Sequence, residues 1–338
     1  MHQAPLRFYR TFFDNASRIL LKTKVGRGPL FVSWDMSYRC NSRCTMCDRW
    51  KRETQEELCL RERIEILKDL AASGVCLVSI CGGEPFLQEG FEEILNTAKE
   101  NKLIVSVTTN GSLIGQNLDL MKYIDNLIIS LDSHIGELHD AIRGFPGLFN
   151  RALDGINAIA GLDRKPALSV RCVLSKRNIA HVEDYVSFFK GKVSKILFQP
   201  IHRSPNSGFS IPEYLSECSQ GEAEIQKKFC NTLNKTRLSN IYNKGIVDFL
   251  FHQDEVKNIS DCLAGYFSAE IDNLGTLWNC AGHTFEFGNL REKKMLEILA
   301  VSENRFRDQG RKLKCACYYN CAMINICLSK IAGRGNKR

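Results

Sequence analysis

The sequence predicts an α/β fold built on a parallel β-sheet, and three observations support this. Short runs rich in β-branched residues alternate with segments whose apolar residues recur every three or four positions. This alternation occurs six times between residues 30 and 200. The strand-like runs are mostly apolar, which indicates burial on both faces of the sheet. Right-handed crossovers between such units give either a barrel or a doubly wound sheet, and periodicity alone leaves both open.

The elements follow one another in a regular order. The helix predicted after the first strand shows the helical spacing clearly, because Leu60, Ile64, Leu67 and Ala71 recur at intervals of four, three and four. The predicted strands are residues 30–36, 75–80, 103–108, 126–131, 168–174 and 195–199. The predicted helices are residues 56–72, 91–100, 118–123, 148–160 and 182–190. After Pro205 the pattern changes to a polar loop, a charged helix over 213–238 and a cysteine-rich region.

The composition indicates the cellular compartment, the state of the thiols and the partners that the protein can have. The chain has 338 residues, 15 cysteines and a net charge of +8. We find no secretory signal pattern and no apolar run near the ~18 residues that a membrane span needs, so we expect a cytoplasmic protein without a transmembrane segment. Thiols stay reduced there, which favours metal or cluster binding over disulfides. The basic residues are mostly dispersed, so no nucleic-acid partner is expected. Residues 6–21 are apolar and basic together, and we expect a helix packed across the bottom of the main domain, with membrane contact as the alternative.

Three cysteines lie directly after the first predicted strand. Cys40, Cys44 and Cys47 are separated by four and three positions, within one short loop. Three thiolates can hold three irons of a cubane cluster and leave the fourth iron open. Zinc is the alternative, but structural zinc sites usually take four ligands, and no fourth Cys or His follows at a suitable short spacing. The loop follows the carboxyl end of a strand, where barrel enzymes build their active sites.

This spacing, Cys40-x3-Cys44-x2-Cys47, resembles the cluster motif of the radical S-adenosylmethionine (radical SAM) superfamily. The resemblance implies a 4Fe–4S cluster whose open iron binds the amino and carboxylate groups of S-adenosylmethionine. It also implies reductive cleavage of that cofactor to a 5′-deoxyadenosyl radical, which abstracts hydrogen from a substrate. A reductant such as flavodoxin or ferredoxin is the expected electron donor. Met46 stands where the family often has an aromatic residue, and its apolar side chain can still cover the adenine.

Further matches to the superfamily follow successive predicted strands. Gly82-Gly83-Glu84-Pro85 is similar to the family's GGEP motif, in which the glycines let the backbone approach the methionine amino group. The resemblance implies cofactor contacts at all four of these residues and at later strand ends. It covers about residues 30–210 and implies a partial, six-stranded (β/α) TIM-like barrel. The remaining implied cofactor residues are Thr109, Asn110, Ser130, Asp132, Arg171 and Gln199.

A second group of cysteines lies near the C-terminus. Cys262-x12-Gly275-x4-Cys280 resembles half of the auxiliary-cluster domain called SPASM, or its shorter relative called twitch. We expect residues 269–272 and 277–280 to form a hairpin that turns at Gly275. The six cysteines from Cys262 to Cys327 do not fill two clusters completely, so one auxiliary 4Fe–4S cluster is favoured, with two clusters or a zinc site as alternatives. The expected ligands are Cys262, Cys280 and two of Cys315, Cys317 and Cys321.

These observations together predict a two-cluster radical SAM enzyme with a small cysteine-rich α+β domain at its C-terminus. The predicted division is an N-terminal helical extension over 1–29, a core barrel over 30–225 and an auxiliary-cluster domain with a basic tail over 226–338. Only 39 residues precede Cys40, too few for the recognition module of many peptide-modifying relatives, which tilts the prediction toward a small metabolite or sugar-like substrate. The alternatives are a maturase of a ribosomally made peptide or protein, and a non-catalytic metal-binding protein.

Overall fold

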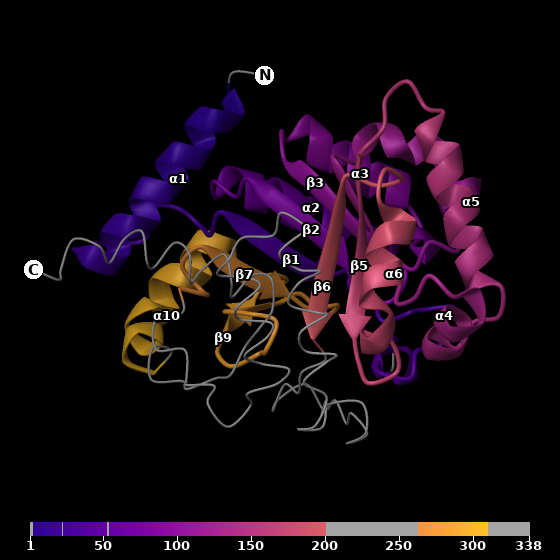
Figure 1. The fold of residues 1–338 in the computed structure, drawn as a ribbon. Coiled ribbons are helices and arrows are strands. Elements are labelled where there is room, and N and C mark those ends of the chain that lie inside the picture. The colour runs from indigo at the N-terminus through magenta and orange to yellow at the C-terminus, as the bar shows by residue number, and fades with distance from the viewer. Residues whose placement is uncertain (1–2, 22, 53, 201–262, 310–338) are drawn as a thin grey trace, which may run out of the picture.

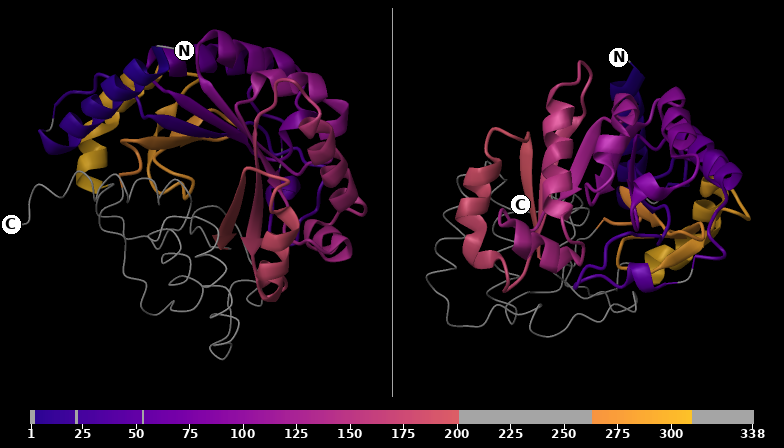
Figure 2. Two further views of the ribbon diagram at one scale, coloured as in Figure 1. Left: turned by 45° about the horizontal axis from the view of Figure 1, so that its top comes forward. Right: turned by 90° about the vertical axis from the view of Figure 1, so that its right-hand side faces the viewer.

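The computed structural model describes residues 3–21, 23–52, 54–200 and 263–309. These residues form a curved, open β-sheet with helices along its convex side (Figures 1 and 2). The strand order is β6-β5-β4-β3-β2-β1-β7-β8-β9, and the first six strands are parallel neighbours in sequence order. Because the sheet is curved and its β–α helices lie on one side, the structure confirms the partial barrel and not a doubly wound sheet.

The predicted strands are present within two residues of their expected ends. They are β1 (Phe31–Asp35), β2 (Leu77–Cys81), β3 (Ile104–Thr109), β4 (Asn126–Ser130), β5 (Ala167–Leu174) and β6 (Lys195–Pro200). The helices between them are α2 (Leu60–Ala72), α3 (Phe91–Glu100), α5 (Leu148–Ala160) and α6 (Val182–Phe189), while the segment Leu118–Tyr123 is a 3-10 helix. Helix α4 (Gly136–Arg143) was not predicted from the sequence. Its buried side chains include His139 and Arg143, so it lacks the apolar stripe that predicts a helix.

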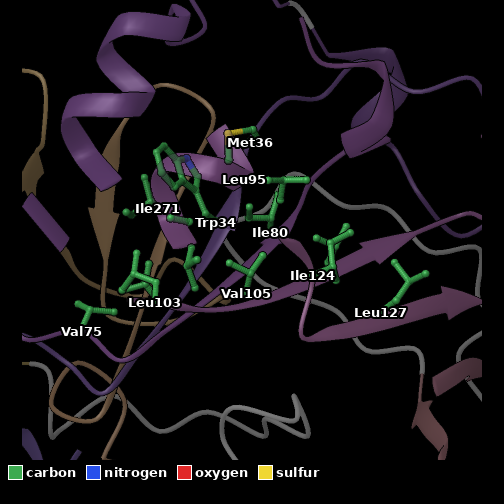
Figure 3. Close-up of a cluster of buried hydrophobic side chains, with 14 of the residues drawn as sticks. Trp34, Met36, Val75, Ile80, Leu95, Leu103, Val105, Ile124, Leu127 and Ile271 are labelled. Atoms are coloured by element: carbon green, nitrogen blue, oxygen red, sulfur yellow. The ribbon is translucent and has the colours of Figure 1, made fainter. Parts of the chain in front are cut away.

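Alternate residues of the strands fill the space between sheet and helices. Trp34, Val105 and Leu127 are fully buried there, together with Ile271 of the C-terminal hairpin (Figure 3). The intervening residues of β1 and β2 lie on the concave face, and toward the carboxyl ends of the strands they are Ser33, Asp35 and Cys81. The sheet therefore has an apolar outer face and, at the carboxyl ends of these two strands, a polar inner one.

Helix α2 begins four residues later than residue 56, where the periodicity placed it. Cys59 is its N-cap, and the Glu62 carboxylate accepts a hydrogen bond from the Cys59 backbone N–H at 2.7 Å. This capping box satisfies two amide groups at the helix start, so the helix begins after Cys59. The residues before Cys59 are therefore not part of the helix and connect it to the cysteine loop.

The C-terminal hairpin extends the same sheet. Strand β7 (Ser268–Ile271) pairs in parallel with β1, and β8 (Thr276–Trp278) and β9 (Glu286–Asn289) follow as antiparallel strands. Gly275 turns the hairpin with a φ of 86°, as expected. Helix α10 (Met295–Gln309), which was not predicted, packs on β9. The predicted boundary at residue 225 lies outside the described residues and stays a prediction.

Helix α1 (Gln3–Leu20) crosses the end of the sheet where the parallel strands begin. Thr11 donates to the Gly74 carbonyl before β2, and the Asn15 amide donates to the Gly28 carbonyl before β1. The ring of Phe12 lies 5.3 Å from that of Phe267, which precedes β7. The helix therefore packs across the bottom of the barrel, as the sequence predicted. Across the described residues, no helix has both the length and the apolar character needed to span a membrane.

Candidate active site

The loop between β1 and α2 carries the three predicted cluster cysteines. Cys44 is buried, and Cys40 and Cys47 are half-buried. All three are free thiols, and the Cys47 amide donates to the Cys44 carbonyl at 3.2 Å. The loop leaves the carboxyl end of β1, so the thiols lie at the end of the barrel opposite α1. This is the end at which parallel barrels place their active sites.

The three thiols influence one another electrostatically. Burial raises the pKa of Cys44 to about 11, Arg143 counteracts the rise, and the neighbouring Cys47 and Cys40 add to it. Burial also raises the pKa of Cys40. Such thiols become thiolates readily only when a positive centre binds them. Three clustered sulfurs with an arginine beside them fit the donor set of an iron–sulfur cluster.

The same loop does not resemble a mononuclear metal site. Among the described residues, no three His, Cys, Asp or Glu side chains are grouped so that they could hold one metal ion. A cubane cluster places a different demand on its ligands, because each thiolate binds a different iron. The thiols of a cubane site therefore need not converge on one point.

The glycine pair after β2 supports the cysteine loop. A Cβ on Gly82 would lie 2.3 Å from the Ser37 carbonyl oxygen, and one on Gly83 would lie 2.0 Å from that of Arg39. The Gly83 and Glu84 amides donate to these two carbonyls at 2.6 and 2.8 Å. In this structure the glycines thus allow close approach of the loop backbone. Their predicted contact with the cofactor stays a prediction.

Glu84 joins the ends of β2 and β3. Its carboxylate accepts from the Thr109 hydroxyl at 2.7 Å, from the Asn110 amide at 2.8 Å and from the Phe86 amide at 3.3 Å. Burial raises the pKa of Glu84 to about 7, although these three hydrogen bonds oppose the shift. Pro85, also buried, begins the 3-10 turn that Glu84 caps. Of the roughly four acceptor sites of a carboxylate, one remains for a further donor, such as an ammonium group.

The polar turn after β3 contacts the cysteine loop directly. The Asn110 side-chain amide donates to Asn41 at 2.7 Å and to the Ser42 hydroxyl at 3.1 Å. Asn41 in turn donates to the Ser112 hydroxyl at 2.9 Å. The predicted motifs after β2 and β3 therefore meet around the loop that carries the cysteines.

Asp132, after β4, positions an arginine beside the cysteines. Its carboxylate forms an ion pair with Arg143, with contacts at 2.6 Å to Nε and 3.0 Å to Nη2. Arg143 Nη1 lies 3.9 Å from the Cys44 sulfur. The Asp132 amide donates to His139 Nδ1, and burial followed by the Arg143 charge lowers the pKa of His139 to about 3. His139 is therefore neutral, and Asp132 is the counter-ion of Arg143.

The remaining predicted cofactor residues lie on this rim or near it. Ser130, at the end of β4, is paired in register with Arg171 of β5. Gln199 is half-buried on β6 opposite Val173. Met46 is half-buried between Cys44 and Cys47. The structure brings these strand ends to one edge of the sheet, while their role in binding a cofactor stays a prediction.

The concave face beside the loop carries buried charges that the sequence analysis did not single out. Asp35 pairs with Arg49, which follows the cysteines. Glu270 of β7, in register with Ser33, pairs with His283 at 3.1 Å. The His283 ring is stacked on Trp278 with centroids 4.6 Å apart. Burial and the nearby Asp35 raise the pKa of Glu270. These groups form a polar surface between the cysteine loop and the C-terminal hairpin.

One cysteine of the predicted auxiliary site, Cys280, lies within the described residues. Cys280 follows β8, and its sulfur lies 3.5 Å from the Thr284 hydroxyl. Burial raises the pKa of its thiol, and the bond with Thr284 acts in the opposite direction. The other expected ligands, Cys262, Cys315, Cys317 and Cys321, lie outside the described residues.

Glu57 and Arg143 are two further residues near the site to which no role was assigned from the sequence. The Glu57 carboxylate accepts from the Tyr38 amide and the Ser37 hydroxyl, both at 2.7 Å, and from Asn273 of the hairpin turn at 3.2 Å. Nothing in the local sequence marks Glu57, because its partners are distant in the chain. Arg143 was visible as part of the run His139-Asp140-x2-Arg143-Gly144, but its contact with Cys44 depends on the fold.

Comparison with known proteins gives a consistent family match. Residues 34–189 match the Radical SAM superfamily. The chain is 25% identical to an AdoMet-dependent heme synthase of Methanosarcina barkeri, over 86% of this chain and 89% of the relative. It is 30% identical to the mycofactocin maturase MftC of Mycobacterium tuberculosis over 47% of this chain, and the match spans 41% of the maturase.

Solved structures show the same fold. Streptococcus suis SuiB bound to its precursor peptide SuiA superposes with a TM-score of 0.68 at 18% identity. The superposition covers 88% of this chain and 70% of SuiB. At this level of identity, the likeness concerns the fold and not the substrate.

Proposed function

We propose, on the premise that this chain carries a radical SAM domain over residues 34–189, that it is an enzyme with a 4Fe–4S cluster on Cys40, Cys44 and Cys47. When bound there, such a cluster supplies the electron that cleaves S-adenosylmethionine to a 5′-deoxyadenosyl radical, which takes a hydrogen atom from the substrate. The observation that carries the proposal is the set of contacts that the predicted motifs make with the cysteine loop.

In this proposal, residues of the chain itself position the cysteine loop and a cation beside it. Gly82, Gly83 and Glu84 fix the start of the loop, and Asn110 fixes its middle. Arg143, oriented by Asp132, puts a positive charge beside the Cys44 sulfur. A fixed cation at this position stabilises negative charge on the sulfurs without any reorganisation during turnover.

In this proposal, the polar groups of S-adenosylmethionine bind residues at the strand ends. In this proposal Glu84 and the neighbouring Thr109 and Asn110 face the methionine amino group, because a carboxylate is the natural partner of an ammonium. Ser130, Arg171 and Gln199 line the next strands of the rim. Met46 covers the adenine with an apolar, adaptable side chain.

The substrate assigned to this site is a small polar molecule. Two of the matched relatives, of which this chain covers 89% and 81%, are AdoMet-dependent heme synthases. The ion pairs Asp35–Arg49 and Glu270–His283, whose carboxylates are buried, offer both donors and acceptors to polar substituents. A peptide substrate is the second candidate, favoured by the 30% identity with the mycofactocin maturase.

An auxiliary cluster forms part of the proposal. Cys280 is assigned as one of its ligands, with Cys262 and two of Cys315, Cys317 and Cys321. It would accept or relay electrons at the mouth of the barrel, next to the polar surface of Glu270 and His283. A reductant of the flavodoxin or ferredoxin type would supply the catalytic cluster.

Anaerobic reconstitution with iron and sulfide tests the function. We expect about eight irons per chain, four for each cluster, and conversion of S-adenosylmethionine to 5′-deoxyadenosine after reduction with dithionite. Zinc in place of iron and no such conversion would refute the proposal.

The substrate class is tested separately by adding fractions of an ultrafiltered cell extract. A small substrate requires that the low-molecular-weight fraction accelerate 5′-deoxyadenosine formation. Acceleration by the retained fraction alone, abolished by prior protease treatment, would establish a peptide substrate instead.

A further inference from the structure

Helix α1 has an unusual distribution of polar and apolar side chains. Its most deeply buried side chains are polar: Thr11 and Asn15 are 0% exposed and Arg18 is 1% exposed. All three contact the rest of the protein, through the Gly74 and Gly28 carbonyls and the Glu303 carboxylate. The polar face of an ordinary surface helix points to solvent. In α1, polar contacts fix the inner face.

The outer face of α1 is apolar. Leu6, Tyr9, Phe13 and Leu20 are spaced by three, four and seven residues, which places them on one stripe of the helix. Their exposed fractions are 51, 57, 66 and 64%, and that of the following Leu21 is 75%. Isolated exposed apolar residues are ordinary, but a contiguous stripe with two aromatic rings marks an interaction surface.

The charges around this stripe are positive. Between residues 1 and 28 the sequence has six Lys or Arg residues and one acidic residue, Asp14. One of the six, Arg18, is buried on the inner face and paired with Glu303, which leaves five. Asp14 is turned toward the protein, where it accepts from the Arg27 amide at 3.0 Å. Arg10 and Lys24 are exposed. The face therefore combines apolar side chains, interfacial aromatics and cations, without an outward carboxylate among its described residues.

We propose that the outer face of α1 is a docking surface for an anionic lipid membrane, on which the helix lies flat. Leu6, Tyr9, Phe13 and Leu20 enter the boundary between headgroups and acyl chains, and Arg10 and Lys24 contact the phosphates. A second copy of this chain fits the face less well, because a self-complementary contact between two such helices brings cations against cations. Anionic headgroups supply the missing negative charge.

The position of α1 is compatible with an active enzyme at the membrane. The helix touches the segments that precede β1, β2 and β7, whereas the cysteine loop follows the carboxyl end of β1. Helix α10 lies beside it, joined by the Arg18–Glu303 ion pair (Figure 1). Docking through α1 leaves the cysteine end of the barrel directed away from the lipid. This inference is independent of the chemistry proposed above.

Sedimentation of the full chain with lipid vesicles tests the surface. We expect it to sediment with phosphatidylglycerol-containing vesicles at least about tenfold more strongly than with pure phosphatidylcholine vesicles, and less at high salt. Phe13→Glu should reduce binding to the phosphatidylcholine level, and Arg10→Ser should weaken it severalfold. Leu274→Glu is the matched control, because it adds the same charge at an exposed apolar residue in the β7–β8 turn. It should bind as the wild type does.

Two results would overturn the proposal. One is equal sedimentation of the wild type and Phe13→Glu with anionic vesicles, with Arg10→Ser also unchanged. The other is a wild-type dimer in light scattering that Phe13→Glu converts to a monomer, which would assign the face to a second copy. Phe13 is mostly exposed, so the variant should keep its fold, and its iron content and circular dichroism verify this.

Discussion

The guanidinium of Arg143 lies 3.9 Å from the sulfur of Cys44. The two residues are distant in sequence, and α4 carries Arg143 back to the cysteine loop. The backbone reinforces the contact, since the Arg43 amide donates to the Arg143 carbonyl at 3.1 Å. A single cation thus connects the strand-end carboxylate Asp132 with one of the proposed cluster ligands.

Replacing Arg143 should change the cluster as well as the fold. Arg143→Gln leaves the buried Asp132 without its counter-ion, which costs about 3–5 kcal/mol of stability. It also removes a positive charge beside the sulfur, so the reduction potential of the reconstituted cluster should become more negative. Potentiometric titration followed by electron paramagnetic resonance measures this shift. Arg143→Lys should restore most of the potential, and Arg164→Gln, at an exposed site, should leave it unchanged.

The three cysteines should be separable from the auxiliary site. A Cys40→Ala/Cys44→Ala/Cys47→Ala variant should retain about half of the reconstituted iron, because the auxiliary ligands are intact. It should form no 5′-deoxyadenosine. Iron analysis and chromatography of the reaction mixture measure both quantities. Cleavage of S-adenosylmethionine by this variant would contradict the assignment of the catalytic cluster.

Gly83 should tolerate no side chain. A Cβ there would lie 2.0 Å from the Arg39 carbonyl oxygen, so Gly83→Ala must displace the start of the cysteine loop. We expect a loss of about 1–3 kcal/mol from this overpacking and a lower iron content after reconstitution. Gly115→Ala is the control, since nothing lies within 4 Å of its added Cβ. Equal iron content and equal thermal midpoints in the two variants would show that the loop does not depend on this close approach.

Much of this arrangement was predictable from local pattern. The strands of the barrel are largely apolar runs such as Leu77–Cys81, and the motifs follow their carboxyl ends, so order in sequence predicted order along the rim. The contacts between motifs were not predictable. Gly83 approaches Arg39, and Asn110 approaches Ser42, only because parallel neighbours align their ends. A local pattern carries no information on such long-range register.

Helices α4 and α1 show a second reason why part of the structure was not predictable from the sequence. Periodicity detects apolar stripes, whereas α4 buries His139 and Arg143, and α1 buries Asn15 and Arg18. In each helix a buried arginine contacts a distant segment, Arg143 at Cys44 and Arg18 at Glu303. Pairing of β7 with β1 was likewise invisible, because the two strands are more than 200 residues apart.

Glu84 should make stability depend on pH near neutrality. Its pKa is raised to about 7 in the fold from an ordinary 4.5. The folded chain therefore binds the proton more tightly, and this stabilisation is fully present below about pH 4.5 and is lost as the pH rises through 7. Between about pH 6 and 8 the loss is about 1 kcal/mol. Thermal midpoints of the wild type and Glu84→Gln are measured at both pH values. The midpoint of the wild type, relative to that of Glu84→Gln, should be lower at the higher pH. A constant difference would show that Glu84 is ionised throughout.

The ion pair that fixes α1 should dominate the stability of the N-terminal region. Arg18 is buried, donates to Glu303 at 2.5 Å and to Asn15 at 2.6 Å, and lies over the Tyr266 ring with its Cζ 5.3 Å from the centroid. Arg18→Met leaves Arg307 as the ion-pair partner of the buried Glu303, and we expect a loss of about 3 kcal/mol, because Arg307 still compensates part of the negative charge. Arg10→Met, on the exposed side of the same helix, should change stability by no more than about 0.5 kcal/mol.

Adding Glu303→Leu to Arg18→Met distinguishes an unpaired charge from lost packing. If the cost of Arg18→Met arises from the weaker compensation of the buried Glu303 carboxylate, the double variant should recover a large part of it, because that charge is no longer present between α1 and α10. Denaturant unfolding of the single and double variants gives the coupling energy. Additive losses would mean that the two side chains act independently, and that α1 is fixed mainly by Thr11, Asn15 and the Phe12–Phe267 contact.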